Sequence, residues 1–196
     1  MSSFLWEYIS GAFTNTLSWL GLSNKEATIL FLGLDNAGKS TLLHRLVHGK
    51  LRSCKPTRYP QKDEMKIGGV SFQAYDLGGH KAAQKVWKEY LDGVHGIVYL
   101  VDAADQKRLP QARKALHNLL VDVPMDCPVL VLGNKIDLAT LSESQVKHAL
   151  GLAEATTGKK HGRPSHRLIR PTEVFMCSIV KEVGYVDGFL WLASML

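Results

Sequence analysis

Residues 28–40 read TILFLGLDNAGKS, an apolar run that passes directly into a glycine-rich turn. The run TILFLGL (28–34) predicts a buried β-strand, because short continuous apolar runs are typical of strands covered on both faces. The turn, Gly33-Leu-Asp-Asn-Ala-Gly38-Lys39-Ser40, fits the phosphate-binding pattern G-x-x-x-x-G-K-[ST]. A helix is predicted over 39–48. Strand, loop and helix in this order form the context that the pattern requires.

Each part of this loop is suited to holding phosphate. Glycines let backbone N–H groups turn inward without a clashing Cβ, and the start of a helix points unpaired N–H groups at the same anion. Lys39 adds a full positive charge toward the β- and γ-phosphates, and the Ser40 hydroxyl is a hard oxygen ligand that suits Mg²⁺. The residues predicted to bind a nucleotide here are Asp35, Asn36, Ala37, Gly38, Lys39, Ser40 and Thr41.

Beyond the loop, apolar runs alternate with amphipathic stretches along the rest of the chain. Further strands are predicted at 62–67, 70–76, 96–102, 128–137 and 173–178, with a hairpin turn at Gly68-Gly69. Helices are predicted at 81–91, 107–121, 143–150 and 187–195. Apolar strands that alternate with helices predict one α/β domain, whose mostly parallel central sheet has helices on both faces.

The segment Asn134-Lys135-Ile136-Asp137 ends one of these apolar runs, at the edge where open α/β sheets bind ligands. The Asp137 carboxylate can accept hydrogen bonds from N1–H and the 2-amino group of guanine, whereas adenine offers neither donor. Lys135 can lay its stem over the base, and Asn134 can tie this segment to the phosphate loop. The pattern NKxD is weak alone, but its place downstream of GKS indicates a guanine-nucleotide site.

A third motif, Asp76-Leu-Gly-Gly79, ends the strand predicted at 70–76. Asp76 can hold a water on Mg²⁺. The backbone N–H of Gly79 can donate a hydrogen bond to a γ-phosphate, and this bond is lost after hydrolysis. Alone, the motif is typical of a simple strand-to-helix turn. Beside the other two motifs, it indicates a nucleotide-dependent switch.

The composition fits a single globular domain: 196 residues, 45% hydrophobic and 21% charged. The net charge of +6 favours an anionic partner, which means nucleic acid, phosphate or an acidic membrane face. Nucleic acid is disfavoured because the basic stretch 159–170 lacks interleaved aromatic residues. That stretch is either a solvated loop or a surface for a partner or anionic lipid. Cys54, Cys127 and Cys177 are too widely spaced for a disulfide framework or a zinc cluster, which favours a reducing compartment.

Residues 4–20, FLWEYISGAFTNTLSWL, predict an amphipathic helix. The polar side chains gather on one arc, and aromatic and aliphatic side chains cover most of the rest. Because an apolar surface of this size attracts burial, we expect the helix to bind a membrane. The alternative is a helix that packs permanently on the domain. The chain thus divides into a membrane-binding helix over 1–22 and a nucleotide-binding domain over 23–196.

Taken together, the motifs resemble those of the ADP-ribosylation-factor branch of the Ras superfamily, and within it the secretion-associated Ras-related (Sar) GTPases. The resemblance covers almost the whole chain and rests on GLDNAGKS, DLGGH, VWKEYL, GIVYLVDAAD, LGNKID, and TTGK followed by RPTEVFMCS. It implies that 23–196 is a P-loop GTPase domain. Ser2 stands where myristoylation needs a glycine. Sar GTPases likewise use an amphipathic helix without a lipid.

The resemblance also implies roles for further residues. Thr57 matches the switch threonine that reaches Mg²⁺ and the γ-phosphate, and Cys177-Ser178-Ile179 matches a loop that touches guanine through backbone groups. His80 occupies the place of the water-orienting glutamine. The implied metal ligands are Asp35, Ser40, Thr57 and Asp76. The implied contacts to base and γ-phosphate come from Gly79, Asn134, Lys135, Asp137, Ser178 and Ile179. No arginine of this chain stands beside the motifs in the sequence. We therefore expect a partner to supply an arginine for hydrolysis.

By the same resemblance, the chain is a GTPase switch with Mg²⁺ as cofactor and GTP or GDP as bound nucleotide. It would recruit the COPII coat, whose inner layer supplies a GTPase-activating subunit, for transport from the endoplasmic reticulum to the Golgi. A membrane-bound exchange factor and lipids of the endoplasmic reticulum would be further partners, at the cytosolic face. The chain departs from the pattern at Ser40, usually threonine, at Lys81, usually apolar, and after Thr57, where a second Pro-Thr pair is missing.

Two other function classes fit parts of the sequence. An ATPase or small-molecule kinase would share the phosphate loop, but the NKID segment argues against it. A nucleotide-binding scaffold without hydrolysis would share all the binding motifs, and only His80 argues against that class.

Overall fold

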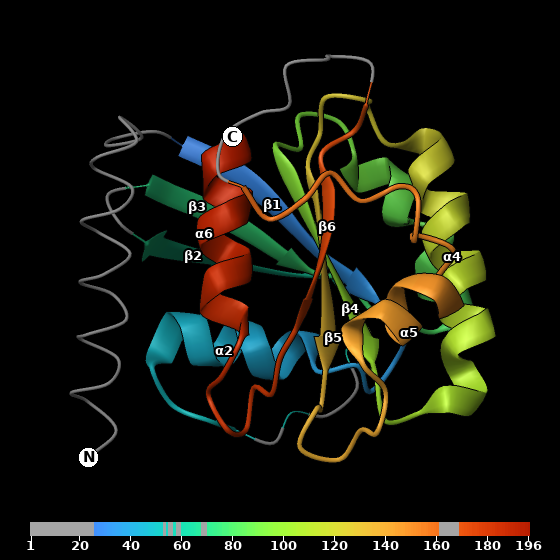
Figure 1. Cartoon of the computed structure of the whole chain (residues 1–196). Coiled ribbons are helices and arrows are strands. Elements are labelled where there is room, and N and C mark those ends of the chain that lie inside the picture. Colours follow the sequence, from blue (N-terminus) through green and yellow to red (C-terminus); the bar gives the residue numbers. More distant parts are fainter. Residues whose placement is uncertain (1–25, 53, 55–56, 58–59, 68–69, 161–168) are drawn as a thin grey trace.

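A computed structural model of the chain describes residues 26–52, 54, 57, 60–67, 70–160 and 169–196 (Figure 1). The helix predicted at 4–20, the turn at Gly68-Gly69 and most of the basic stretch 159–170 lie outside these residues. Among the helices described, none is long and apolar enough to cross a membrane.

The domain is built on a six-stranded sheet in the order β2-β3-β1-β4-β5-β6 (Figure 1). Neighbouring strands run parallel except β2 and β3, which form an antiparallel pair. The predicted mostly parallel sheet is therefore confirmed. The strands are β1 (Glu26–Gly33), β2 (Gln61–Ile67), β3 (Val70–Asp76), β4 (Gly96–Asp102), β5 (Val129–Asn134) and β6 (Thr172–Met176).

Helices cover both faces of the sheet, as predicted (Figure 1). The main ones are α2 (Lys39–His48), α4 (Leu109–Asp122), α5 (Glu143–Ala149) and α6 (Tyr185–Met195). In β1, Ile29 and Phe31 pack in one core with α2 and α6, whereas Leu30 and Leu32 pack in a second core with α4 and α5. Successive strand residues point to opposite faces, so a strand buried on both faces must be apolar throughout.

The helix predicted over 81–91 is wrong as a single element. The structure has a short helix α3 (Lys81–Gln84) and a 3-10 helix η1 (Trp87–Tyr90), joined by a turn. Trp87 is buried, and its indole N–H donates to the carbonyl oxygen of Gly78 at 3.0 Å. Tight i→i+3 bonds, such as Val86 N–H to Ala83 O, replace the regular helical pattern. Anchoring of the tryptophan to the preceding loop thus interrupts the helix.

The strand order determines where a ligand can bind. From β1 the chain runs to β2 and β3 on one side of β1, and then crosses to β4 on the other side. The carboxyl end of β1 therefore lies at the topological switch point, the usual ligand crevice of open parallel sheets. The loop after Gly33 and the segments after Asp76 and Asn134 all follow carboxyl ends at this edge.

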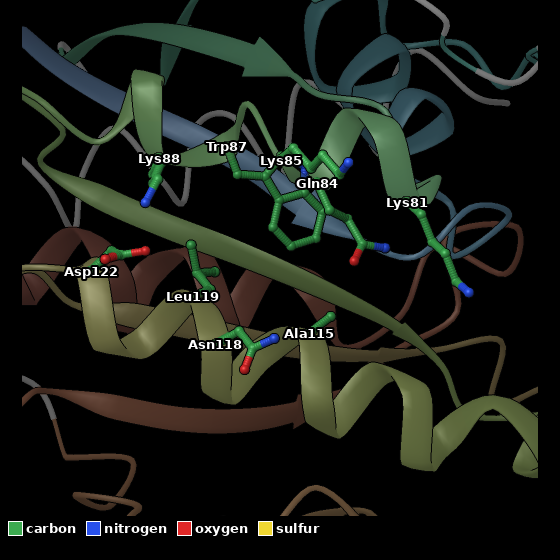
Figure 2. Close-up of a pocket in the computed structure, with 9 residues that line it drawn as sticks. All are labelled: Lys81, Gln84, Lys85, Trp87, Lys88, Ala115, Asn118, Leu119 and Asp122. Carbon is green, nitrogen blue, oxygen red and sulfur yellow. The ribbon is translucent and has the colours of Figure 1, made fainter.

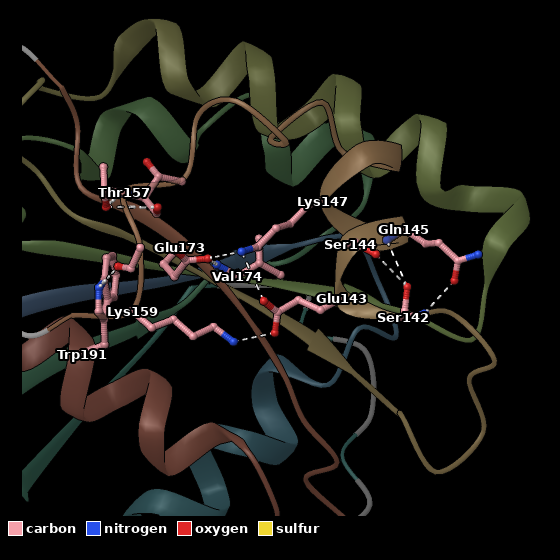
Figure 3. Close-up of polar contacts among 12 residues, drawn as sticks. Ser142, Glu143, Ser144, Gln145, Lys147, Thr157, Lys159, Glu173, Val174 and Trp191 are labelled. Atoms are coloured by element: carbon pink, nitrogen blue, oxygen red, sulfur yellow. Dashed lines mark hydrogen bonds and ion pairs between the residues drawn. The ribbon is translucent and has the colours of Figure 1, made fainter.

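β6 is an edge strand, and a buried carboxylate protects its open side (Figure 3). Glu173 is 1% exposed, and its Oε1 accepts from Val174 N–H at 2.8 Å and pairs with Lys147 Nζ at 2.6 Å. Glu143 joins Lys147 to Lys159. Burial lowers the pKa of Lys147, but its bonds to Glu173 and Glu143 outweigh that and raise the pKa above its usual value. A charge turned inward at a sheet edge blocks pairing with another strand.

This network yields a stability prediction. Replacing Glu173 by Ala removes the acceptor of a buried N–H and a buried ion partner, so the free energy of unfolding should fall by about 3 kcal/mol. Glu173→Gln keeps an oxygen acceptor and should cost about 1 kcal/mol. Urea unfolding measures both changes. Glu154→Ala, at an exposed glutamate, is the matched control and should stay within about 0.5 kcal/mol of the parent. Equal losses at Glu173 and Glu154 would contradict the role of this network.

Candidate nucleotide site

The phosphate loop ends at the first turn of α2, which carries no side-chain cap and no acidic residue. Gly38 at the N-cap has φ 106°, and Gly33 at the start of the loop has φ 134°. At Gly33 a Cβ would lie 2.1 Å from the carbonyl oxygen of Leu100, so glycine is required there. The first N–H groups of α2 therefore point into the loop without a side-chain acceptor, as the phosphate-binding pattern predicts. Asn36, Ala37 and Thr41 belong to this loop and turn.

Lys39 lies inside the loop rather than above it. The side chain is buried, and its ammonium donates to the carbonyl oxygens of Gly33 and Leu34, both at 3.0 Å. Burial lowers the pKa of Lys39, and the nearby carboxylates of Asp76 and Asp35 oppose this shift. The two carbonyls leave part of the ammonium's hydrogen-bonding capacity for an anion in the loop.

Ser40, Thr57 and Asp76 meet beside the loop. The Asp76 Oδ2 atom accepts from Ser40 Oγ at 2.5 Å and from Thr57 Oγ1 at 2.9 Å, and the two hydroxyls are 2.8 Å apart. Burial raises the pKa of Asp76, while the two hydrogen bonds lower it. The Asp76 Oδ1 atom is buried without a hydrogen-bond partner in the described part of the chain. Two hydroxyls and a carboxylate with an unused oxygen are the hard donors that Mg²⁺ prefers.

Asp35, predicted near the metal, makes a different contact. Its Oδ1 accepts from the backbone N–H of Gly79 at 2.9 Å, and the structure does not join it to the Ser40–Thr57–Asp76 cluster. Gly79 lies so close to the loop that a Cβ would be 2.2 Å from Asp35 N. The N–H predicted to reach a γ-phosphate is thus paired here with a carboxylate of the phosphate loop itself.

The expectation that no arginine of the chain lies beside the motifs is wrong. Arg108 Nη1 donates to the carbonyl oxygen of Asp35 at 3.0 Å, and Arg108 Nε donates to Asp105 Oδ2 at 2.6 Å. The signal was present in the sequence: Arg108 follows shortly after β4, and β4 pairs directly with β1. Residues that follow neighbouring parallel strands meet at one edge of the sheet.

His80 lies on the surface next to Gly79 and begins α3. Its Nδ1 accepts from Ala83 N–H at 3.2 Å, so the imidazole caps this short helix. Because Nδ1 is an acceptor, the neutral ring carries its proton on Nε2. The ring is therefore held by α3 with Nε2 as its second polar atom.

On the opposite side, Asn134 ties three segments together, as predicted for the phosphate loop. The amide donates to Ala37 O at 2.9 Å, and its oxygen accepts from Ile179 N–H at 3.2 Å. The Cys177 thiol also faces this oxygen at 3.8 Å, and burial raises the pKa of Cys177 to about 12. Cys177 is thus a neutral packing group below Asn134.

Asp137 and Lys135 flank the position expected for the base. Asp137 is exposed, and its Oδ1 accepts from the hydroxyl of the buried Ser178 at 2.6 Å. This bond fixes the carboxylate and leaves its second oxygen available for a ligand. Lys135 has φ 67° and pairs with Asp102 Oδ2 at 2.7 Å, which holds its stem across this edge of the sheet.

Comparison with known proteins gives one consistent answer. Residues 13–196 match the model of the ADP-ribosylation factor family. The chain belongs to the ADP-ribosylation factor family. A relative in Giardia intestinalis, named "Small COPII coat GTPase SAR1", is 42% identical over 94% of this chain and 97% of its own. A relative of the same name in Nicotiana tabacum is 42% identical over 93% of this chain and 96% of its own.

A solved structure supports the fold. The Arl6 BBS3 small GTPase from Trypanosoma brucei, determined with the nucleotide analogue GppNp, superposes with a TM-score of 0.72 at 23% identity. The match covers 86% of this chain and 95% of that one. This match confirms the predicted fold. The family model and the two relatives named as GTPases confirm the predicted family and enzyme class, so this chain is a small GTPase that binds guanine nucleotides. The class of ATPases and kinases and that of non-hydrolysing scaffolds are set aside.

The geometry of Asp137 predicts how the base is selected. Asp137→Asn replaces a fixed carboxylate acceptor by an amide, so GTP affinity should fall by about 2 kcal/mol, roughly thirtyfold. Displacement of a fluorescent GTP analogue by unlabelled GTP measures this loss. Asp126→Asn, at an exposed aspartate outside the site, is the control and should bind GTP as the parent does. Unchanged affinity in Asp137→Asn would show that another group reads the base.

Proposed function

We propose that this GTPase is a switch that recruits the COPII coat to the membrane of the endoplasmic reticulum, for transport of proteins to the Golgi. The observation that carries the proposal is the 42% identity, over nearly the whole chain, to two relatives named small COPII coat GTPases. In this proposal the protein is peripheral on the cytosolic face of that membrane. Its partners are the inner coat with its GTPase-activating subunit, a membrane-bound exchange factor and membrane lipids, and not nucleic acid.

Mg²⁺ is the proposed cofactor, and Ser40, Thr57 and Asp76 are the residues that would hold it. When bound, the ion would neutralise charge on the β- and γ-phosphates. Asp76 supports this assignment, because its Oδ1 is buried and without a hydrogen-bond partner among the described residues. The mutual bonds of the two hydroxyls already bring these three side chains to one point. Asp35 is the weaker member of the predicted ligand set, since its carboxylate binds Gly79 instead.

The contact between Asp35 and Gly79 suggests how the loop after β3 would respond to GTP or GDP. A γ-phosphate oxygen would be a second charged acceptor for Gly79 N–H, and it would compete with the Asp35 carboxylate for this one donor. Movement of Gly79 would be passed on, because its carbonyl accepts from Gln84 Nε2 at 2.6 Å and the Gly78 carbonyl accepts from Trp87. The loop, α3 and η1 would therefore respond as a unit to hydrolysis.

For hydrolysis we assign the orientation of the attacking water to His80. Its Nδ1 is held by α3, so Nε2 is the atom with a free bonding direction. Arg108 is held by Asp105 and the Asp35 carbonyl, which makes it a support of the loop. An arginine from the coat partner would then supply the missing charge, which is worth about 10³–10⁵ in rate.

Two variants of His80 separate catalysis from helix capping. His80→Asn can still accept from Ala83 N–H and cap α3, whereas His80→Gly has no side chain that could do so. Both should bind GTP normally and hydrolyse it about a hundredfold more slowly, since both lack the imidazole. Phosphate release in a single turnover measures the rate. A normal rate in His80→Asn would mean that the ring acts only as a cap.

The N-terminal segment 1–22 is the proposed membrane anchor, with its aromatic and aliphatic side chains inserted at the lipid interface. The segment contains no lysine or arginine, so the apolar contribution should dominate its affinity. The alternatives are a helix that stays packed on the domain and anchoring by the basic stretch 159–170.

Deletion of residues 1–20 tests the anchor. The shortened chain should bind GTP normally but lose GTP-dependent binding to liposomes, measured by flotation. For the full chain, moderate salt should weaken flotation only slightly, because salt screens charges and not apolar contacts. Flotation that survives the deletion, or that moderate salt removes, would identify the basic stretch as the anchor. Equal flotation of the GDP and GTP forms would contradict a switched anchor.

A further inference from the structure

A pair of histidines lies on α2, away from the nucleotide site. The groove of about 500 Å³ between the α3–η1 segment and α4 (Figure 2) is part of the proposed switch, because Trp87 lines it and donates to Gly78 O. α2 packs in the core on the opposite face of the sheet. Its His44 and His48 belong neither to that groove nor to the nucleotide site.

The two histidines share one face of the helix. They are four positions apart in the last turns of α2, and side chains at this spacing are neighbours on a helix surface. Their imidazole rings have centroids 4.5 Å apart and planes inclined by 53°. His44 is half-buried and His48 is exposed. One ring is therefore held against the domain, while the other can rotate toward it.

A backbone carbonyl determines where the His44 ring carries its proton. The Nδ1 atom lies 2.9 Å from the carbonyl oxygen of Lys50. A carbonyl can only accept, so Nδ1 donates and the neutral ring has its lone pair on Nε2. Metal-binding histidines usually donate their other ring N–H to a carbonyl or carboxylate, which orients the ring and makes the ligand nitrogen more basic. His44 Nε2 is thus available as a metal ligand.

The end of the helix is also electrostatically suited to a cation. The last turn of α2 carries the negative end of the helix dipole. Arg45 lies in the same turn, but its guanidinium pairs with Glu182 at 2.6 Å and donates to Gly49 O at 2.6 Å, so its charge is compensated. Lys50 is exposed, and its ammonium can extend into water away from the two rings.

The imidazole nitrogens select the class of metal. Ni²⁺, Cu²⁺ and Zn²⁺ bind imidazole well, whereas Mg²⁺ prefers oxygen. Bonds of about 2 Å place two nitrogen ligands about 3.3 Å apart in a tetrahedral shell. Rings whose centroids are 4.5 Å apart can reach this separation by rotation about their side-chain bonds. The described residues hold no cluster of three or more histidine, cysteine or acidic side chains suited to a metal, so water would complete the shell.

We propose that His44 and His48 form a surface site for a divalent transition-metal ion of the class of Ni²⁺, Cu²⁺ and Zn²⁺. The site is separate from the Mg²⁺ proposed at the nucleotide, and it does not depend on the proposed coat function. The bound ion bridges the last turn of α2. Through the contact of His44 with the Lys50 carbonyl, it also holds the chain that follows the helix.

The test uses the full chain, loaded with GDP and kept in excess Mg²⁺. Ni²⁺ is the probe, because it suits imidazole, whereas Zn²⁺ also suits thiols such as that of Cys54. Isothermal titration calorimetry gives the affinity and the stoichiometry. The test variant is His48→Gln. The matched control is His148→Gln, at an exposed histidine in the last turn of α5 that has Ser144 one turn before it.

We expect one Ni²⁺ per chain and about hundredfold weaker binding to His48→Gln, because a two-ligand chelate becomes a single ligand. His148→Gln should bind as the parent does, and further Mg²⁺ should not displace Ni²⁺. In NMR spectra, substoichiometric Ni²⁺ should broaden the imidazole signals of His44 and His48 together and spare those of His148.

Several outcomes would overturn the site: no Ni²⁺ binding by the parent, parent-like binding by His48→Gln, or an equal loss in His148→Gln. Displacement of Ni²⁺ by Mg²⁺ would also overturn it, because the probe would then occupy the nucleotide site. His44→Gln is the second variant and should lose binding as His48→Gln does. Urea unfolding and GDP binding show that each variant is folded, so a loss of Ni²⁺ binding reports on the imidazoles.

Discussion

The unpaired N–H groups at the start of α2 are the constraint on which the site depends. Neither a side-chain cap nor an acidic residue of the first turn compensates for them. The buried ammonium of Lys39 adds charge at the same point, where desolvation already lowers its pKa. Such a helix end stabilises an anion bound beside it, through its N–H groups and the helix dipole. The sheet order places it at the switch point beside β1, and the loops after the other strands therefore converge on the same edge of the sheet.

The phosphate side of the site is held by bonds that a ligand can replace. Asp35 is an acceptor for Gly79 N–H, Gly33 and Leu34 are acceptors for Lys39, and Asp76 is an acceptor for Ser40 and Thr57. Each of these acceptors is an oxygen, as are the acceptors of a nucleotide phosphate. Exchange of one oxygen for another costs little net energy. In the proposed switch, small differences in acceptor strength would therefore move the loop of Gly78 and Gly79, together with the α3–η1 segment bonded to it.

The sequence predicted those features that depend on local pattern or on a fixed motif. The strand at 28–34 was predictable because both of its faces are buried, and Asn134 because its spacing from the phosphate loop is characteristic. The break between Gln84 and Trp87 was not predictable, since it depends on an indole reaching back to Gly78. Arg108 and Asp35 are far apart in the chain, and only the pairing of β1 with β4 brings them together. Glu173 resembles an ordinary polar strand residue until its burial at the edge is seen.

The base side is built in the opposite way, from internal bonds that no ligand needs to displace. Asn134 joins the phosphate loop to the segment after β6, Ser178 orients Asp137, and the buried Arg45 pairs with Glu182 at 2.6 Å to hold that segment on α2. The Glu173 network fixes β6 itself. Residues that select the base must keep their acceptors in place while the phosphate contacts change. Discrimination against adenine is lost once the Asp137 carboxylate can move. In the proposed switch, the fold would therefore combine a half with fixed contacts that selects the nucleotide and a half with exchangeable contacts that responds to its state.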